Sequence, residues 1–219
     1  MITDQTPEWP VERLFLWRLL YPPVRTIVMA LVRVRVEGRE HLPASGPYII
    51  ASNHIDWKDP PLITITLDRS VRYMAKIQAF SYPLLGYILR ATGAFPVRRG
   101  EGDRRALVTA LRVLRGGQIL GFFPEGHRSE SGALLRGKPG IGFLASRVPE
   151  VPFVPVAMIG TKQPLLRLIF GGHAILRVGR PFRLAELSAD ERRDEQAITD
   201  AIMRRIAALL PAEMRGAYP

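Results

Sequence analysis

Short apolar runs constrain the fold of this chain more than any other sequence feature. PYIIASN (47–53) and QILGFF (118–123) carry no charge and are typical of buried strands. VPFVPVAMIG (151–160) is also uncharged, and we interpret it as core, although its prolines would also fit an edge strand or a bulge near a site. Further strands are expected at VRYMAK (71–76), GAFPV (93–97) and AILRVGRPF (174–182).

Helical patterns accompany these strands. DRRALVTALRVLR (103–115) places leucines on one face, with Asp103 as its N-cap and a Gly-Gly pair at its end. Ser188 and Glu191 form a capping-box pattern for a C-terminal helix that reaches about Leu210. Strands that alternate with helices predict an α/β fold, a single domain with a mostly central β-sheet flanked by helices.

The first 36 residues differ in character from the rest. VERLFLWRLLYPPVRTIVMALVRVRV (11–36) is apolar with interspersed arginines, and Pro22-Pro23 is expected to break it into two helices. An apolar face with aromatic and basic residues suits a helix lying at a membrane surface, and the expected contacts are Leu14, Trp17, Arg18, Leu20 and Tyr21. The alternative is a helix packed on its own domain. We therefore expect a membrane-associating segment at 1–36 and the folded domain at 37–219.

Composition restricts the partners. The chain has 31 Lys and Arg against 20 Asp and Glu, a net charge of +11, and residues 69–115 carry +8 of it. Such a chain favours polyanions: nucleic acid, anionic lipid or phosphorylated small molecules. Residues 97–118 contain no aromatic residue on which bases would stack, so we expect no nucleic-acid partner.

The absence of cysteine excludes several kinds of chemistry. Disulfides, cysteine-based zinc sites and a thiol nucleophile are all ruled out. No cofactor is expected. No stretch approaches the ~20 apolar residues that span a bilayer, and the N-terminus lacks the pattern of a secretory signal. We expect the protein in the cytoplasm or, as a peripheral or monotopic protein, on the cytoplasmic face of the cell membrane.

His54 and Asp59 stand in SNHIDWKDP, directly after the first apolar run. An imidazole titrates near neutrality and suits proton transfer when a carboxylate holds one ring nitrogen protonated. Asp59 can reach back to His54 across one turn, whereas Asp56 is expected to point elsewhere. Two alternatives remain: a histidine that caps a strand with solvated acids nearby, and a metal site of His54, Asp56 and Asp59, which would need one more ligand.

Two further polar blocks follow apolar strands. GAFPVRRG (93–100) presents Arg98, whose planar guanidinium matches phosphate oxygens. FFPEGHRSE (122–130) presents Glu125 to anchor an arginine or a substrate hydroxyl, Gly126 for close backbone approach, and Arg128 to hold an anion. The alternatives are a solvated arginine pair and a solvated charged turn.

In this order, the blocks resemble the glycerophospholipid acyltransferase family, specifically its PlsC-type 1-acylglycerol-3-phosphate acyltransferases. The family pattern H-x-x-x-x-D matches His54 and Asp59, and the phosphate-binding arginine of its second block matches Arg98. E-G-[TS]-R-S matches 125–129, and V-P-[VI]-x-P-V-A matches 151–157. YMAKIQAFSYPLLG and GKPGIGFLA, between the blocks, resemble family segments as well. The resemblance covers about residues 35–185.

Three positions depart from the family pattern. His127 replaces a small hydroxyl residue, Gln78 replaces a glutamate near Lys76, and Asp56 stands where serine or another small polar residue is common. These departures bear on acceptor preference and leave the His54–Asp59 pair intact.

The resemblance implies transfer of a fatty acyl group from acyl-CoA or acyl-carrier protein to a lysophospholipid at an anionic membrane. His54, polarised by Asp59, would act as general base. Arg98, with Lys76 and Arg128, would hold the acceptor phosphate, and Glu125 would orient the acceptor or the arginines. Backbone N–H groups beside Gly126 or in 151–157 are expected to stabilise the oxyanion. Glycerol 3-phosphate, another lysophospholipid or a glycolipid are alternative acceptors, and a noncatalytic lipid-binding protein is the alternative of another class.

Overall fold

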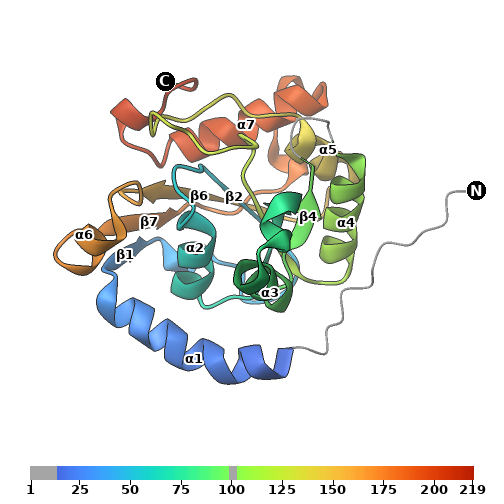
Figure 1. Cartoon of the computed structure of the whole chain (residues 1–219). Coiled ribbons are helices and arrows are strands. Elements are labelled where there is room, and N and C mark those ends of the chain that lie inside the picture. The colour runs from blue at the N-terminus through green and yellow to red at the C-terminus, as the bar shows by residue number, and fades with distance from the viewer. Residues whose placement is uncertain (1–13, 99–102) are drawn as a thin grey trace, which may run out of the picture.

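A seven-stranded sheet forms the centre of the molecule (Figure 1). The computed structural model describes residues 14–98 and 103–219, and for residues 14–18 and 20 it describes the backbone alone. The strands are β1 (Val34–Glu37), β2 (Ile49–Ser52), β3 (Val71–Lys76), β4 (Phe95–Val97), β5 (Ile119–Phe122), β6 (Phe153–Ile159) and β7 (Ala174–Val178). Their order across the sheet is β1-β7-β6-β2-β5-β3-β4.

Neighbouring strands are parallel except for β6 and β7, which pair antiparallel. β1 and β7 therefore run opposite to the other five strands. β2 lies between β5 and β6, and all its residues are buried. This confirms an α/β domain with a mostly parallel central sheet, and it confirms the six expected strands; β1, at the edge, was not predicted.

Helices cover both faces of the sheet. They are α1 (Leu14–Leu31), α2 (Asp59–Leu67), α3 (Pro83–Ala91), α4 (Arg104–Arg115), α5 (Gly140–Arg147), α6 (Leu165–Ile169) and α7 (Glu195–Ala207). One apolar core joins α4, α5 and α7 to the sheet, and a second joins α1, α2 and α6 to its other face (Figure 1). Ile49 belongs to the first core and Ile50 to the second, because successive side chains of a strand point to opposite faces.

Helix α1 continues through Pro22 and Pro23, so the expected break into two helices is wrong. The two prolines remove two N–H donors, yet their fixed φ is compatible with a helix and a bend can absorb the steric conflict. Contacts with α2 flank the prolines. The hydroxyl of Tyr21 donates to the carbonyl of Thr64, and Arg25 donates to the carbonyl of Ile65 and pairs with Asp68 at 3.2 Å. Helix α1 is curved in Figure 1.

These contacts show that α1 packs on its own domain, as one of the two alternatives expected. Its outer side still exposes Leu19, Val24, Ile27 and Leu31. The expected contacts Leu14, Trp17, Arg18 and Leu20 lie outside the side chains that the structure describes. β1 follows α1 and pairs with β7. Residues 34–36, which were predicted to belong to the N-terminal membrane-associating segment, are therefore part of the sheet. None of the described helices is both long and apolar enough to span a bilayer.

Asp103 caps α4 as predicted, accepting hydrogen bonds from the N–H groups of Arg105 and Ala106. The capping box of Ser188 and Glu191 is also present, with reciprocal hydrogen bonds of 3.2 and 3.0 Å. It begins only a short 3₁₀ turn, Asp190–Arg192, because the chain then becomes extended at Asp194. Asp194, not Ser188, is the N-cap of α7, whose last helical residue is Ala207.

Helices α5 and α7 approach closely at Gly142. A Cβ at this position would lie 1.9 Å from the carbonyl oxygen of Glu195, which is backbone and cannot rotate away. We expect Gly142→Ala to lower the free energy of unfolding by roughly 1–3 kcal/mol or more, through overpacking. Urea denaturation followed by circular dichroism measures the change.

Gly140→Ala is the matched control on the same helix. A Cβ there would lie 3.5 Å from Leu107 and Phe122, an ordinary contact. This variant should keep the stability of the parent chain, and an equal loss in both variants would contradict the assignment of the Gly142 contact.

Candidate active site

His54 lies two residues beyond the end of β2, with its side chain 8% exposed. Its Nδ1 lies 2.9 Å from Oδ2 of Asp59, which is fully buried. Asp59 begins α2, and the prolines that follow it suit the first turn because the N–H groups there have no helical partner. The apolar strand and the Asp-Pro-Pro helix start thus bring the two side chains together, as the spacing predicted.

The carboxylate of Asp59 accepts three more hydrogen bonds. The N–H groups of Ile55 and Asp56 each donate to Oδ2 at 2.8 Å, and the hydroxyl of Thr161 donates to Oδ1 at 2.6 Å. Four donors match the acceptor capacity of a buried carboxylate. The ring of His54 is therefore oriented by an acid that is itself fixed, and Nε2 remains as the ring nitrogen available to a reactant.

The side chain of Asp56 takes no part in this pair. Its Oδ1 accepts from the main-chain N–H of Lys58 at 3.0 Å and from Nζ of Lys58 at 2.5 Å. Within residues 14–98 and 103–219, no group of three or more His, Asp and Glu side chains is placed to hold a metal ion. The expectation that Asp56 points elsewhere is confirmed.

Glu125 holds the main chain of His54. It is 1% exposed, and its Oε1 and Oε2 accept from the N–H groups of His54 at 2.8 Å and Leu135 at 3.1 Å. Burial raises the pKa of Glu125 to about 7, against the opposite effect of these two hydrogen bonds. The N–H of Ser129 donates to the carbonyl of His54 at 2.8 Å, so both main-chain groups of His54 are bound by the 125–129 segment.

Two further contacts hold the imidazole and the strand end that carries it. The ring of Phe123 stacks on that of His54, with centroids 4.2 Å apart and an interplanar angle of 23°. The buried side-chain amide of Asn53 exchanges two hydrogen bonds with the main chain of Met158 in β6, at 2.9 and 2.7 Å. The strand end that carries His54 is thus joined to β5 and to β6, and the ring has little freedom to turn.

His54 opens into a cavity of about 880 Å³. Its walls include the apolar side chains of Met74, Val97, Leu107, Phe122 and Phe143. Among the described residues, four cationic ones also line it, Arg98, Arg104, Lys138 and Arg147, against two acidic ones, Asp103 and Glu195. A base, apolar walls and excess positive charge in one cavity suit an amphiphilic anion.

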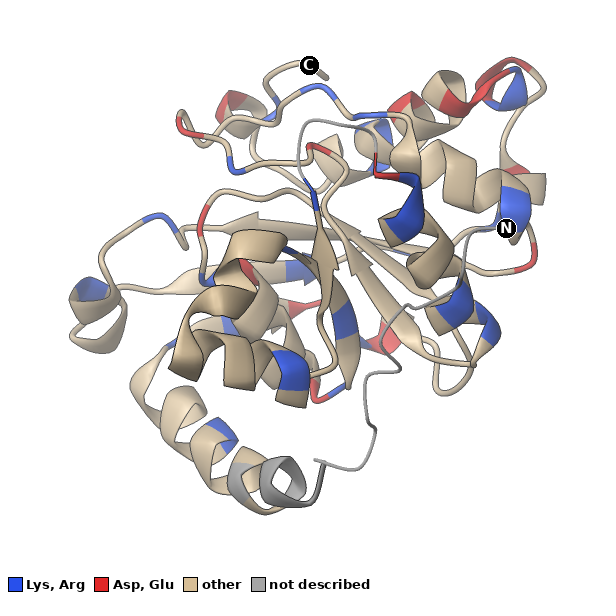
Figure 2. Cartoon of the chain, turned by 45° about the vertical axis from the view of Figure 1, so that its right-hand side comes forward, with Lys and Arg blue, Asp and Glu red and all other residues tan. Residues whose placement is uncertain are grey.

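The predicted anion-binding residues occupy different positions. Arg98 and Gly126 line the cavity. Lys76 and Arg128 are exposed side chains that are not among its lining residues, and Glu125 is buried beside His54. Basic residues lie on helices and loops on both sides of the sheet (Figure 2).

Sequence reasoning missed Phe123, Lys138 and Thr161. Phe123 is next to the predicted E-G-x-R-S block, and Lys138 stands in the quoted segment GKPGIGFLA, but neither had a signal that assigned a contact. Thr161 follows β6 and is 102 positions from Asp59, so no local pattern links the two. The 151–157 segment belongs to the buried β6 region, where main-chain groups pair within the sheet. The N–H of Gly126 is paired as well, because it donates to the carbonyl of Phe123 at 3.0 Å.

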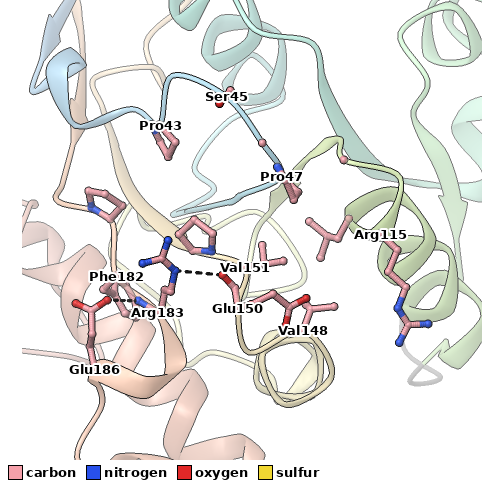
Figure 3. A pocket seen from close by; sticks show the side chains of 15 residues that line it. Pro43, Ser45, Pro47, Arg115, Val148, Glu150, Val151, Phe182, Arg183 and Glu186 are labelled. Carbon is pink, nitrogen blue, oxygen red and sulfur yellow. Dashed lines mark hydrogen bonds between the residues drawn. The ribbon is translucent and has the colours of Figure 1, made fainter.

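A second cavity, of about 780 Å³, lies at the other end of the strands (Figure 3). It is bounded by Pro47, Gly117 and Val151, which precede β2, β5 and β6, whereas His54 follows β2. Arg183 there donates to the carbonyl of Glu150. Val151 and Pro152 of the predicted 151–157 segment line this cavity, but His54, Asp59 and Arg98 do not.

Comparison with known proteins gives concordant matches. A family model described as acyltransferase matches residues 33–159. The 1-acyl-sn-glycerol-3-phosphate acyltransferase of Bacillus subtilis is 31% identical over 179 residues, which are 80% of this chain and 87% of the relative. The lyso-ornithine lipid O-acyltransferase of Rhizobium meliloti is 32% identical over 155 residues, 65% of this chain and 51% of the relative.

A solved structure has the same fold. The crystal structure of the 1-acyl-sn-glycerophosphate acyltransferase PlsC from Thermotoga maritima superposes with a TM-score of 0.69 at 25% identity, over 90% of this chain and 80% of that one.

We expect Thr161→Val, which keeps the side-chain volume, to leave Oδ1 of Asp59 without its hydroxyl donor. An unsatisfied buried acceptor costs roughly 1–3 kcal/mol of stability. The low-field NMR resonance of the His54 Nδ1–H proton should shift as well, because its acceptor is no longer held.

Thr199→Val separates the two effects. Thr199 is also fully buried and accepts from the N–H of Gly142, away from His54. This variant should lose stability without moving the His54 resonance. An unmoved resonance in Thr161→Val would show that Thr161 does not position the pair.

Proposed function

This chain belongs to the acyltransferase family and is an enzyme of that class, and on this premise we propose that it acylates the free hydroxyl of 1-acylglycerol 3-phosphate to form phosphatidic acid. The observation that carries the proposal is the His54–Asp59 pair at a cavity that Arg98 also lines. Relatives in Bacillus subtilis and Arabidopsis thaliana are both named 1-acyl-sn-glycerol-3-phosphate acyltransferases. The chain spans 36% of the latter.

The proposed reaction has one base and no covalent enzyme intermediate. Nε2 of His54 takes the proton of the acceptor hydroxyl while Nδ1 stays bound to Asp59. The acceptor oxygen attacks the thioester carbonyl, and the carbon–sulfur bond then breaks. The imidazolium returns the proton to the departing thiolate, so the products are the ester and a free thiol. The chain has no cysteine that would carry the acyl group as a thioester.

Arg98 is the proposed ligand of the acceptor phosphate, because it lines the same cavity as His54 and its guanidinium suits phosphate oxygens. Lys76 and Arg128 lie outside the lining, so we propose that they add to the positive potential that attracts the anion. Glu125 is proposed to position His54 through its main chain. Main-chain N–H groups beside Gly126 are proposed to stabilise the developing oxyanion, because the N–H of Gly126 itself donates to the carbonyl of Phe123.

The donor is proposed to be acyl-CoA or acyl-carrier protein, with no further cofactor. The acceptor is a membrane lipid, and α1 exposes Leu19, Val24, Ile27 and Leu31 on one segment next to the domain. We therefore propose peripheral or monotopic attachment to an anionic membrane at its cytoplasmic face. The match to a lyso-ornithine lipid O-acyltransferase keeps another lysolipid as a second candidate acceptor.

One assay tests the reaction and the acceptor together. The purified chain is incubated with labelled acyl-CoA or acyl-carrier protein and a panel of lysolipids, and the products are identified by mass spectrometry. We expect phosphatidic acid as the main product. His54→Ala should lower kcat by roughly 10²–10⁴-fold, the usual contribution of general-base catalysis.

His173→Ala is the matched control, because His173 is exposed at the start of β7 and does not line the cavity. Near-normal turnover by His54→Ala would overturn the mechanism. A preferred product other than phosphatidic acid would replace the acceptor and leave the mechanism standing.

Membrane attachment is tested on α1 itself. The double variant Val24→Ser, Ile27→Ser removes exposed apolar surface. We expect its partition onto phosphatidylglycerol-containing vesicles to fall roughly tenfold or more, because buried apolar area supplies the affinity. Sedimentation with vesicles measures the partition.

The control is Leu165→Ser, Leu166→Ser on α6, which removes exposed apolar area elsewhere. Release of the α6 variant in place of the α1 variant would assign the attachment surface to α6.

A further inference from the structure

Arg98 is one of several cationic residues that line the cavity, and these residues make different contacts. The guanidinium of Arg147 stacks on the ring of Phe143, with 4.9 Å to the centroid. Arg104 stands in the first turn of α4, and it is exposed, as are Arg98, Lys138 and Arg147. Lys138 is different, because its side chain lies against the turn that holds His54.

Three contacts define the position of Lys138. Its N–H donates to the carbonyl of Pro124 at 2.8 Å. Gly126 has a φ of +74°, and a Cβ there would lie 3.1 Å from Cδ and 3.3 Å from Nζ of Lys138. The ammonium group therefore lies over the main chain of Gly126. A side chain at position 126 would be strained and would crowd the lysine.

The same turn reaches His54 through its other residue. Glu125, between Pro124 and Gly126, binds the N–H of His54 at 2.8 Å. The general base and the lysine are thus fixed by consecutive residues of one segment, and both face the cavity that Arg98 lines. Among the residues that the structure describes, no carboxylate forms an ion pair with Lys138 or Arg98.

Asp103 is a lining acid, yet its carboxylate is engaged by main-chain donors. It accepts from the N–H groups of Arg98, Arg105 and Ala106 at 2.9 to 3.2 Å. It therefore anchors the main chain at Arg98, and the two side chains form no ion pair among the described residues. Arg98 and Lys138 are thus two lining cations without an ion pair in the described part of the chain, and Lys138 in addition lies against the turn that holds His54.

We infer that Lys138, together with Arg98, binds the phosphate of the acceptor and selects anionic lysolipids over neutral ones. This inference rests on the proposed function and adds to it a residue that the sequence motifs did not indicate. A lysine serves here as a point charge that follows the phosphate, while the arginine fixes its orientation through paired N–H groups.

The test compares Lys138→Met with Lys162→Met, in the full chain. Lys162 is an exposed lysine that donates to the carbonyl of Glu130 and does not line the cavity, so both variants lose the same charge. With saturating acyl donor, Lys138→Met should raise the KM for 1-acylglycerol 3-phosphate roughly ten- to a hundredfold, as for a lost hydrogen bond to a charged group. The KM for the donor should stay within about twofold, and Lys138→Arg should recover part of the loss.

Equal KM values for the acceptor in Lys138→Met and the parent chain would overturn the inference. An increase confined to the acyl donor, or an equal increase in Lys162→Met, would overturn it as well. Circular dichroism melting of each variant separates loss of binding from loss of fold.

A binding measurement keeps the inference separate from the proposed function. Glycerol 3-phosphate is titrated into each protein without donor, by isothermal titration calorimetry. Weaker binding to Lys138→Met than to Lys162→Met supports the cation pair even if the parent chain acylates a different lysolipid. Equal binding to both variants overturns it even if phosphatidic acid is the product.

Discussion

The buried carboxylate of Asp59 is the group on which the site depends. An unpaired anion in a fully buried position is costly, so each of its acceptor positions needs a donor. The donors come from the residues after β2, from the ring of His54 and from Thr161 after β6. Satisfying this one group therefore requires that the ends of two adjacent strands and the start of α2 meet, which is the geometry that orients the imidazole.

The parts of the site that are local in sequence were predictable. His54 and Asp59 are five positions apart, and an apolar run before them places the histidine at a strand end. Asp103 caps α4 because a side chain three positions away is within reach of the free N–H groups. The same kind of local reasoning wrongly predicted a break in helix α1. Contacts of Tyr21 and Arg25 with α2, about 40 positions away, outweigh the local effect of two prolines.

The remaining parts depend on contacts that no spacing encodes. Thr161 is paired with Asp59 only because β2 and β6 are neighbours in the sheet. The placement of the basic residues is a second example, because the sequence showed that the chain is basic but not which Lys and Arg residues line the same cavity. Lys76 is exposed at the end of β3, whereas the main-chain N–H of Lys138 is hydrogen-bonded to the turn after β5. A long-range field comes from all basic residues, but contact with a phosphate requires a fixed position.

The turn at 123–126 contacts both the proposed base, His54, and the proposed phosphate ligand, Lys138. Phe123 stacks on the imidazole, the carboxylate of Glu125 binds the main chain of His54, and Gly126 leaves room for Lys138. Burial disfavours the charged form of Glu125 and raises its pKa to about 7, and two main-chain N–H groups offset only part of this effect. This arrangement fixes the position of the proposed base relative to Lys138, because a shift of the turn would displace His54 and Lys138 together. In the proposed function, proton transfer and phosphate binding both depend on this segment of four residues, and a rigid turn would hold the hydroxyl of a bound lysolipid at a constant distance from Nε2.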